Sequence, residues 1–217
     1  MTATPNAPPA DEVSDPARPA EEGPPPVDLP ADAGEMLLRL AREVVVATAR
    51  GQLRMADLSS LLPEELPAVL QETAAAFVTL HESGQLRGCV GTFATDRPLW
   101  ETVVSAAASA ASRDPRFFPV AEPEVAWLSI DVSVLGPAVP LQDASAFQPG
   151  IHGIIVERGP WRGLLLPEVA TDQGWGVGEM LEGACLKAGL PPDAWRDAKT
   201  QLLVFRTARV SEAGGRG

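Results

Sequence analysis

The segment of residues 85–93, QLRGCVGTF, places a thiol, a guanidinium and two glycines next to one another. If the segment is extended, its side chains alternate between two faces, so Arg87, Cys89 and Gly91 share one face. A cation beside a sulfur favours the thiolate, which is the form that attacks electrophiles and binds metals. Gly88 and Gly91 leave the backbone bare, so main-chain N–H groups around the cysteine can receive an anion. These residue types predict a reactive thiol, Cys89, beside an anion-binding stretch of backbone.

A purely structural interpretation of the same residues stays open. Free cysteines are commonly small buried hydrophobes, and Cys89 can be one of them. Arg87 on a central strand needs a carboxylate or carbonyl acceptor, and we expect that partner to be Asp114 or Asp131. Asp131 alternates with apolar neighbours, so if it faces inward it must be paired, and Arg87 or Arg116 is its expected partner.

Further candidates for a binding site lie outside this segment. Arg116, in the sequence DPRF, can bind a carboxylate or phosphate with two parallel hydrogen bonds. His152 can approach Cys89 as a base, or it can make a structural hydrogen bond. His81 ends a strand just before a turn, and we expect it to be exposed and without a role. Glu168 follows a proline and is either an acid of the site or a carboxylate at a helix start. The residues expected to bind a substrate are Arg87, Gly88, Gly91, Thr92, Arg116, His152 and Glu168.

Sequence spacing gives no support for a metal or cofactor. Neither C-x-x-C nor H-E-x-x-H occurs, so no metal site is expected. The P-loop and the dinucleotide fingerprint are also missing from the sequence, so no cofactor is expected. Cys185 falls on the apolar stripe of a helical pattern and is interpreted as a core residue. Two cysteines about a hundred residues apart favour reduced thiols over a disulfide framework.

The length and the net charge of the chain narrow the range of possible functions further. The chain has 217 residues and a formal charge of −12, which argues against an electrostatic grip on nucleic acid. Its apolar runs are far shorter than the roughly 20 residues needed to cross a bilayer, so no membrane partner is expected. The first residues carry acids and prolines in place of a basic, apolar signal, so we expect a cytoplasmic protein.

The periodicity of apolar residues predicts an α+β fold. Residues 1–30 hold nine prolines and scattered acids, so they are interpreted as a disordered tail, followed by a domain over 31–212 and a flexible end at 213–217. Helices are expected at 34–50, 98–111 and 178–188, and strands at 73–80, 85–90, 127–135, 151–157, 161–166 and 201–210. Hairpin-connected strands without βαβ regularity predict a mixed, largely antiparallel sheet with packed helices.

Several segments resemble, in order, the AMMECR domain family, known in prokaryotes as AmmeMemoRadiSam system protein A. They are residues 86–93 (LRGCVGTF), 114–117 (DPRF), 128–135 (LSIDVSVL), 152–154 (HGI), 164–170 (LLLPEVA), 174–175 (GW) and 185–190 (CLKAGL). The resemblance covers residues 34 to 212 and implies a larger and a smaller lobe. It also implies association with a radical SAM protein and a Memo-type protein, in a family whose biochemical role is unsettled.

Three hypotheses for function follow. The first is the resemblance itself, a protein of this family acting beside a radical SAM protein and a Memo-type partner. The second is a thiol-dependent enzyme in which Cys89 acts on an anionic small molecule held by Arg87 and Arg116. The third is a non-catalytic accessory that holds an intermediate or presents a surface to its partners.

Overall fold

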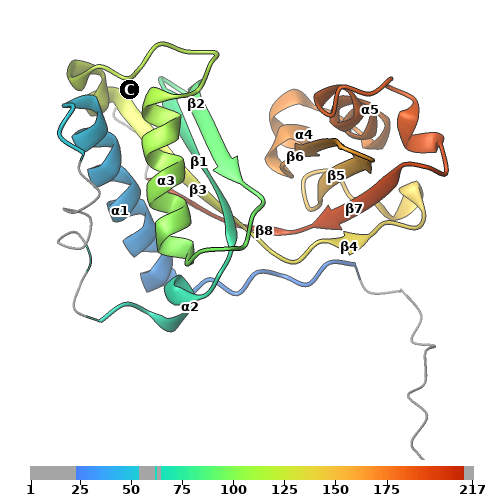
Figure 1. Cartoon of the computed structure of the whole chain (residues 1–217), viewed down its shortest axis with the longest axis horizontal. Helices are drawn as coiled ribbons and strands as arrows, with labels where there is room; N and C mark the ends of the chain where they lie inside the picture. The colour runs from blue at the N-terminus through green and yellow to red at the C-terminus, as the bar shows by residue number, and fades with distance from the viewer. Residues whose placement is uncertain (1–22, 54–61, 63–64, 213–217) are drawn as a thin grey trace, which may run out of the picture.

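The structure, a computed structural model, describes residues 23–53, 62 and 65–212 (Figure 1). Its strands are β1 (Ala75–Glu82), β2 (Gln85–Thr92), β3 (Leu128–Leu135), β4 (Val139–Pro140), β5 (Gly153–Arg158), β6 (Trp161–Leu165), β7 (Gln201–Phe205) and β8 (Thr207–Ser211). Its helices are α1 (Ala31–Ala49), α2 (Ala68–Gln71), α3 (Leu99–Ser112), α4 (Glu168–Gln173) and α5 (Val177–Lys187), with short 3-10 turns at Glu122–Trp127, Ala144–Ala146 and Ala194–Arg196.

The strands form two four-stranded sheets, one in each of two lobes. The first sheet has the order β2-β1-β3-β8 and the second the order β4-β7-β5-β6. Every strand pair in both sheets is antiparallel. The predicted α+β class is therefore confirmed, and the antiparallel strands are divided between a larger first lobe and a smaller second lobe.

Two helices cover one face of the first sheet. Helices α1 and α3 lie against it (Figure 1), and the side chains between them form the largest core cluster. The alternate residues Ala76, Val78 and Leu80 of β1 point into this core and are fully buried. The alanine-rich α3 approaches the sheet so closely that a Cβ on Gly88 would lie 2.5 Å from the carbonyl oxygen of Ala110. We call this the inner face of the first sheet.

The hairpin that carries the QLRGCVGTF segment forms as predicted. Ser83 and Gly84 both have positive φ, 50° and 77°, which gives a two-residue turn whose twist suits the flanking strands. The register between β1 and β2 shifts at one point, where Leu80 faces Gly88 and the next residue of β1 faces Leu86. Arg87 is therefore an extra residue in β2, a β-bulge.

The last predicted strand, 201–210, is divided at Arg206. Its first half, β7, pairs with β5 in the second sheet, and its second half, β8, pairs with β3 in the first. The break follows from the two-lobe architecture, because one extended segment cannot lie in two differently oriented sheets without a bend. Arg206 accepts a hydrogen bond from the backbone N–H of Gly136 at 2.9 Å, which joins the two segments that cross between the lobes.

An apolar cluster fills the contact between the lobes. Phe77 and Phe93 from the first lobe pack with Phe205, which is fully buried, and with the leucines and isoleucine of the second sheet. The rings of Phe77 and Phe93 lie 5.5 Å apart between centroids, a favourable tilted arrangement. The two sheets therefore turn their outer faces toward each other around this cluster.

Residues 23–30 run extended before α1 and contact the fold. Pro24 is buried, and Val27 and Leu29 pack against the core of the first lobe. A Cβ added to Gly136 would lie 2.8 Å from the Val27 side chain. Residues 23–30 therefore also contact the chain segment that passes from the first lobe to the second. The eight residues thus lie against the domain, although composition placed them in the predicted tail. The remainder of that tail, residues 1–22, and residues 213–217 lie outside the described residues.

We predict that the two parts of the tail differ in their effect on stability. A chain that starts at Gly23 should keep the thermal midpoint of the full chain. A chain that starts at Ala31 should lose roughly 1–3 kcal/mol of unfolding free energy, because Val27 and Leu29 no longer bury apolar surface. The Val27→Ala, Leu29→Ala double variant of the full chain is the control, and it should lose a similar amount. Equal midpoints for the chains that start at Gly23 and at Ala31 would contradict a stabilising role for residues 23–30.

Candidate functional site

Beside the apolar cluster, the outer face of the first sheet carries polar side chains and is turned toward the second lobe. Because the inner-face residues alternate with the outer ones, the register places side chains from all four strands on this surface. We call it the polar face, and it consists of Thr79, His81, Cys89, Asp131, Ser133 and Arg209. Cys89, Thr79 and Asp131 lie opposite one another in a single row across β2, β1 and β3.

Cys89 presents its sulfur on the polar face at the edge of the sheet. The residue is partly exposed, in contrast to Cys185, which is fully buried on α5. The hydroxyl of Thr79 donates a hydrogen bond to the Cys89 sulfur over 3.3 Å. Cys89 is therefore held in place by a polar neighbour and remains within reach of solvent, whereas Cys185 is a core residue as predicted.

The loop 113–118 closes the edge of β2 at Cys89. Strand β2 is the first strand of its sheet, so the main-chain groups of Cys89 that point away from β1 need other partners. The carboxylate of Asp114 accepts the Cys89 N–H at 2.8 Å, and the Arg116 guanidinium lies 3.4 Å from the Cys89 carbonyl oxygen. Asp114 and Arg116 thus take the place of a neighbouring strand at this one residue.

Asp114 and Arg116 also bind each other with two hydrogen bonds. The Nε and Nη2 atoms of Arg116 donate to the Asp114 carboxylate at 2.9 and 2.6 Å. The Asp114 side chain is only 2% exposed, whereas that of Arg116 is 53% exposed. The hydrogen bond from Arg116 is the main cause that lowers the pKa of Asp114 to about 2, against the opposing effect of burial. Asp114 is therefore a permanently charged anchor beside the cysteine.

Arg87 forms a half-buried ion pair, but its predicted partner is wrong. Its Nε and Nη2 atoms donate to Glu124 at 3.0 and 3.2 Å, and Nη1 donates to the carbonyl of Phe118 at 3.0 Å. The β-bulge at Arg87 and the 3-10 turn that carries Glu124 bring the two together, which strand alternation alone does not predict. The hydrogen bond from Arg87 lowers the pKa of Glu124. Arg87 thus fixes the neighbouring loop, and its guanidinium is committed to Glu124 and Phe118.

Asp131 also has partners other than the predicted ones. It accepts a hydrogen bond from Nη2 of Arg209 at 2.6 Å and lies 3.2 Å from Nδ1 of His81. Both partners stand diagonal to Asp131 on the adjacent strands, where long side chains can reach it. The expectation of an exposed, unengaged His81 is wrong, because its side chain is 22% exposed and lies against this carboxylate.

The second lobe contributes two charged residues to the polar face. Glu168, at the start of α4, accepts a hydrogen bond at 2.9 Å from the hydroxyl of Ser133, which is 1% exposed. Glu168 is therefore both the first residue of a helix and a hydrogen-bond partner of the opposite lobe. Lys187, near the end of α5, is the second charge, and sequence reasoning did not select it.

The ammonium of Lys187 lies near both Cys89 and Arg116. Lys187 is exposed at the surface, and desolvation by the neighbouring protein is the first cause that lowers its pKa. A Cys89 thiolate would raise this pKa, and the Arg116 cation lowers it. Charges act on one another chiefly within a Debye length of about 8–10 Å, so Lys187 lies within electrostatic reach of Cys89 and Arg116. Two signals in the sequence point to Lys187: it lies in the CLKAGL segment, and it is one of two lysines among 17 basic residues.

Gly88, Gly91 and Thr92 lie beside the cysteine with contacts of their own. Gly88 points to α3 on the inner face, and a Cβ on Gly91 would lie 2.3 Å from the ring of Phe77. The Thr92 hydroxyl accepts the N–H of Ala94 at 3.0 Å. Gly91 and Thr92 line a cavity of about 240 Å³ between β2 and α3, on the other side of the strand from the lobe contact. Close packing accounts for both glycines.

His152 lies apart from the cysteine. It is 4% exposed, and its Nδ1 accepts the backbone N–H of Gln148 at 3.2 Å. Burial is the first cause that lowers the pKa of His152, and the Arg206 cation is the second. Within residues 23–53, 62 and 65–212, no hydrogen bond or ion pair links His152 to Cys89, so the structural interpretation fits its contacts.

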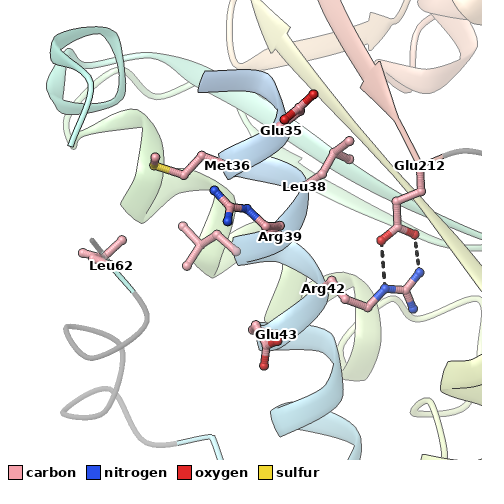
Figure 2. A pocket seen from close by; sticks show the side chains of 9 residues that line it. Glu35, Met36, Leu38, Arg39, Arg42, Glu43, Leu62 and Glu212 are labelled. Carbon is pink, nitrogen blue, oxygen red and sulfur yellow. Dashed lines mark hydrogen bonds and ion pairs between the residues drawn. The ribbon is translucent and has the colours of Figure 1, made fainter. Parts of the chain in front are cut away.

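A larger cavity, of about 830 Å³, lies along α1 (Figure 2). Figure 2 shows Arg42 facing Glu212, and the two are joined by a bidentate ion pair in which Nε donates at 2.9 Å. The cavity is bounded by Leu62, whose neighbours in the chain lie outside the described residues. None of the residues of the polar face lines it, so it is separate from the candidate site.

Comparison with known proteins defines the class. The model of the family described as AMMECR1 matches residues 38–210, and the chain belongs to this family. A protein of Methanothermobacter thermautotrophicus is 41% identical over 192 residues, which cover 86% of this chain and 97% of that protein. A Thermococcus kodakarensis protein, TK0174, is 39% identical over 189 residues, covering 82% and 89% of the two chains. The crystal structure of the uncharacterized protein PH0010 from Pyrococcus horikoshii superposes with a TM-score of 0.80 at 35% identity, covering 87% of this chain and 96% of the other.

In the part of the chain that the structure describes, no helix combines the length and the apolar character that a membrane span needs. No group of three or more His, Cys, Asp or Glu side chains among those residues is arranged to hold a metal ion.

We predict that Asp114→Asn lowers stability in a pH-dependent way. The lowered pKa of Asp114 corresponds to a stabilisation on the order of 2 kcal/mol at neutral pH. This contribution is present above the unfolded-state pKa of about 4 and is lost as the pH falls through 4 toward 2. Urea unfolding of wild type and variant should therefore give free energies that differ at about pH 7 and converge on acidification. Asp96→Asn, at an exposed ion pair with Arg97, should match wild type throughout. A pH-independent difference would contradict the assignment to the Asp114 charge.

Proposed function

We propose that this AMMECR1-family protein uses the Cys89 thiol on a small anionic molecule held between the two lobes. The observation that carries the proposal is the convergence of two cations from different lobes, Arg116 and Lys187, on a partly exposed sulfur. A carboxylate or phosphate is the ligand that such a pair would attract. The thiol is the nucleophile, and the cations bind and orient the substrate.

Arg116 suits this role because its guanidinium is only partly used. Nε and Nη2 are bound to Asp114, while Nη1 has no acceptor among the described residues. Asp114 therefore holds the guanidinium plane in one orientation, and 53% of the Arg116 side chain remains exposed. A pre-oriented arginine with a free edge loses little entropy when an anion binds.

A non-catalytic accessory role is the second candidate. It is favoured by exposed apolar side chains next to the Arg87–Glu124 pair, namely Phe118, which is 90% exposed, and Leu86, which is 42% exposed. Exposed apolar groups of this kind mark surfaces that bind partners. A radical SAM protein and a Memo-type protein are the partners that the family resemblance implies, and in this proposal they supply or receive the anionic molecule.

We predict that Cys89 is alkylated faster than Cys185 and that it prefers an anionic reagent. Cys185 is fully buried, and burial raises the pKa of its thiol, so it should react slowly. Iodoacetate and iodoacetamide differ in charge but are similar in size. The ratio of their rates at Cys89 should exceed that of a small free thiol, and it should fall several-fold in Lys187→Ala and with added salt. Rates can be followed at each cysteine by peptide mass spectrometry.

Lys199→Ala is the matched control, because it removes the other lysine of the chain. It should leave the rate ratio at Cys89 unchanged. A ratio no higher than that of a free thiol would remove the anion site. Labelling of Cys89 that is as slow as labelling of Cys185 with both reagents would remove the thiol chemistry and favour the accessory role.

A further inference from the structure

The site described so far lacks a base for the thiol, and one of the two histidines of the chain is in a position to supply it. We propose that Cys89, His81 and Asp131 form a nucleophile, base and orienting carboxylate for acyl transfer from a small anionic thioester or activated ester. The inference rests on the proposed use of Cys89 and adds to it the base, the reaction class and the substrate class.

The register of the first sheet brings the three residues together on one surface. Cys89 and Asp131 lie in one row, on either side of Thr79 of β1. His81 is two residues beyond Thr79 on the same strand and therefore on the same face. It is diagonal to Cys89 on one side and to Asp131 on the other. Diagonal neighbours have Cα atoms about 7–8 Å apart, a span that an imidazole can bridge toward a sulfur or a bound substrate.

The contact with Asp131 distinguishes the two ring nitrogens of His81. Nδ1 lies 3.2 Å from the Asp131 carboxylate on the β3 side, and the negative charge of that carboxylate favours the proton on Nδ1. The second ring nitrogen, Nε2, points away from Asp131 and is left as the proton acceptor. An imidazole with one nitrogen beside a carboxylate and the other available to a nucleophile is the arrangement that cysteine and serine acyl-transfer enzymes share, and the proposal assigns Nε2 of His81 to Cys89 from its diagonal position on β1.

Arg209 completes the arrangement by fixing the carboxylate. It donates to Asp131 at 2.6 Å, and its own side chain is 38% exposed. The Asp131 side chain is 10% exposed, so a charge there requires such a partner. Asp131 and Arg209 are positioning residues, whereas Cys89 and His81 would touch the reacting atoms.

The reaction follows directly from these roles. His81 Nε2 takes the thiol proton of Cys89 while the sulfur attacks the carbonyl carbon of the substrate. The carbonyl oxygen gains negative charge, which the Lys187 cation stabilises. The C–S or C–O bond to the leaving group then breaks, and His81 returns the proton to that leaving group. Water or an acceptor alcohol, amine or thiol next attacks the Cys89 thioester by the same proton route, which regenerates the thiol.

p-Nitrophenyl acetate is the probe for the test, since it acylates reactive thiols. Acetylation of Cys89 in the full chain is measured by peptide mass spectrometry, so that hydrolysis in solution does not enter. His81→Ala should slow acetylation of Cys89 at least tenfold, and added imidazole should restore much of the loss. Imidazole replaces a missing base but does not repair a structural defect. Asp131→Asn should also slow acetylation, without rescue by imidazole.

Matched controls separate the base from its surroundings. Ser129→Ala, at the position in β3 that faces His81 in register, should acetylate like wild type. His152→Gln, which changes the other histidine, should do the same. His81→Gln keeps a donor near Asp131 but has no basic nitrogen, and it should acetylate as slowly as His81→Ala; it serves in place of His81→Ala if that variant does not fold.

The outcomes distinguish this inference from the proposed function. If wild-type Cys89 reacts no faster than Cys185 with iodoacetate and iodoacetamide, the proposed function fails. If Cys89 reacts rapidly but a folded His81 variant acetylates at the wild-type rate, the base is overturned and the thiol stays. Loss of acetylation in His81→Ala without imidazole rescue would also overturn the assignment of His81 as the base.

Discussion

The arrangement around Cys89 depends on the hydrogen bonds that the buried Asp114 carboxylate accepts. This carboxylate accepts the main-chain N–H of Cys89 and holds the Arg116 guanidinium, so one charge fixes both the edge of the sheet and the orientation of a cation. An edge strand without such a partner would present unpaired main-chain groups at this residue. The loop that supplies Asp114 therefore protects the strand and builds one wall of the candidate site.

The inner face of the first sheet stabilises the fold, and the outer face carries the residues of the candidate site. The inner face packs on α1 and α3, which gives the strands a rigid support. The outer face meets the second lobe through an apolar cluster around Phe77 and Phe205, and the charged groups gather beside that cluster. Apolar contact of this kind keeps the lobes together, while the nearby low-dielectric surroundings strengthen the interactions among Asp131, Arg209 and His81.

Periodicity was sufficient to predict most of the fold. Helices α1, α3 and α5 and the β1–β2 hairpin appear where apolar spacing and turn residues place them, because these signals are local, whereas the short helices α2 and α4 were not predicted. The division of the last strand at Arg206 was not predictable, since nothing in residues 201–210 reveals that the two halves serve different sheets. The packing of Val27 and Leu29 was also not predictable, because a proline-rich composition does not reveal that an extended segment packs against the core of the first lobe.

The candidate site was predicted in part. The QLRGCVGTF segment and Arg116 lie together, since they depend on the strand and the loop next to it. The partners of Arg87 and Asp131 were wrong, because a bulge and strand order decide them, and neither is visible in local spacing. His81 and Lys187 were passed over for the same reason: their importance arises from the register of β1 against β3 and from the approach of the second lobe.

The proposed site depends on the approach of Lys187, on the second lobe, to Cys89 on the first. A heterobifunctional reagent with the shortest available spacer between a thiol-reactive and an amine-reactive group tests it directly. After reaction with the full chain and proteolysis, mass spectrometry should find Cys89 linked to Lys187 and not to Lys199. A link from Cys89 to Lys199, or no intramolecular link in a folded protein whose Cys89 has reacted with the reagent, would contradict the account.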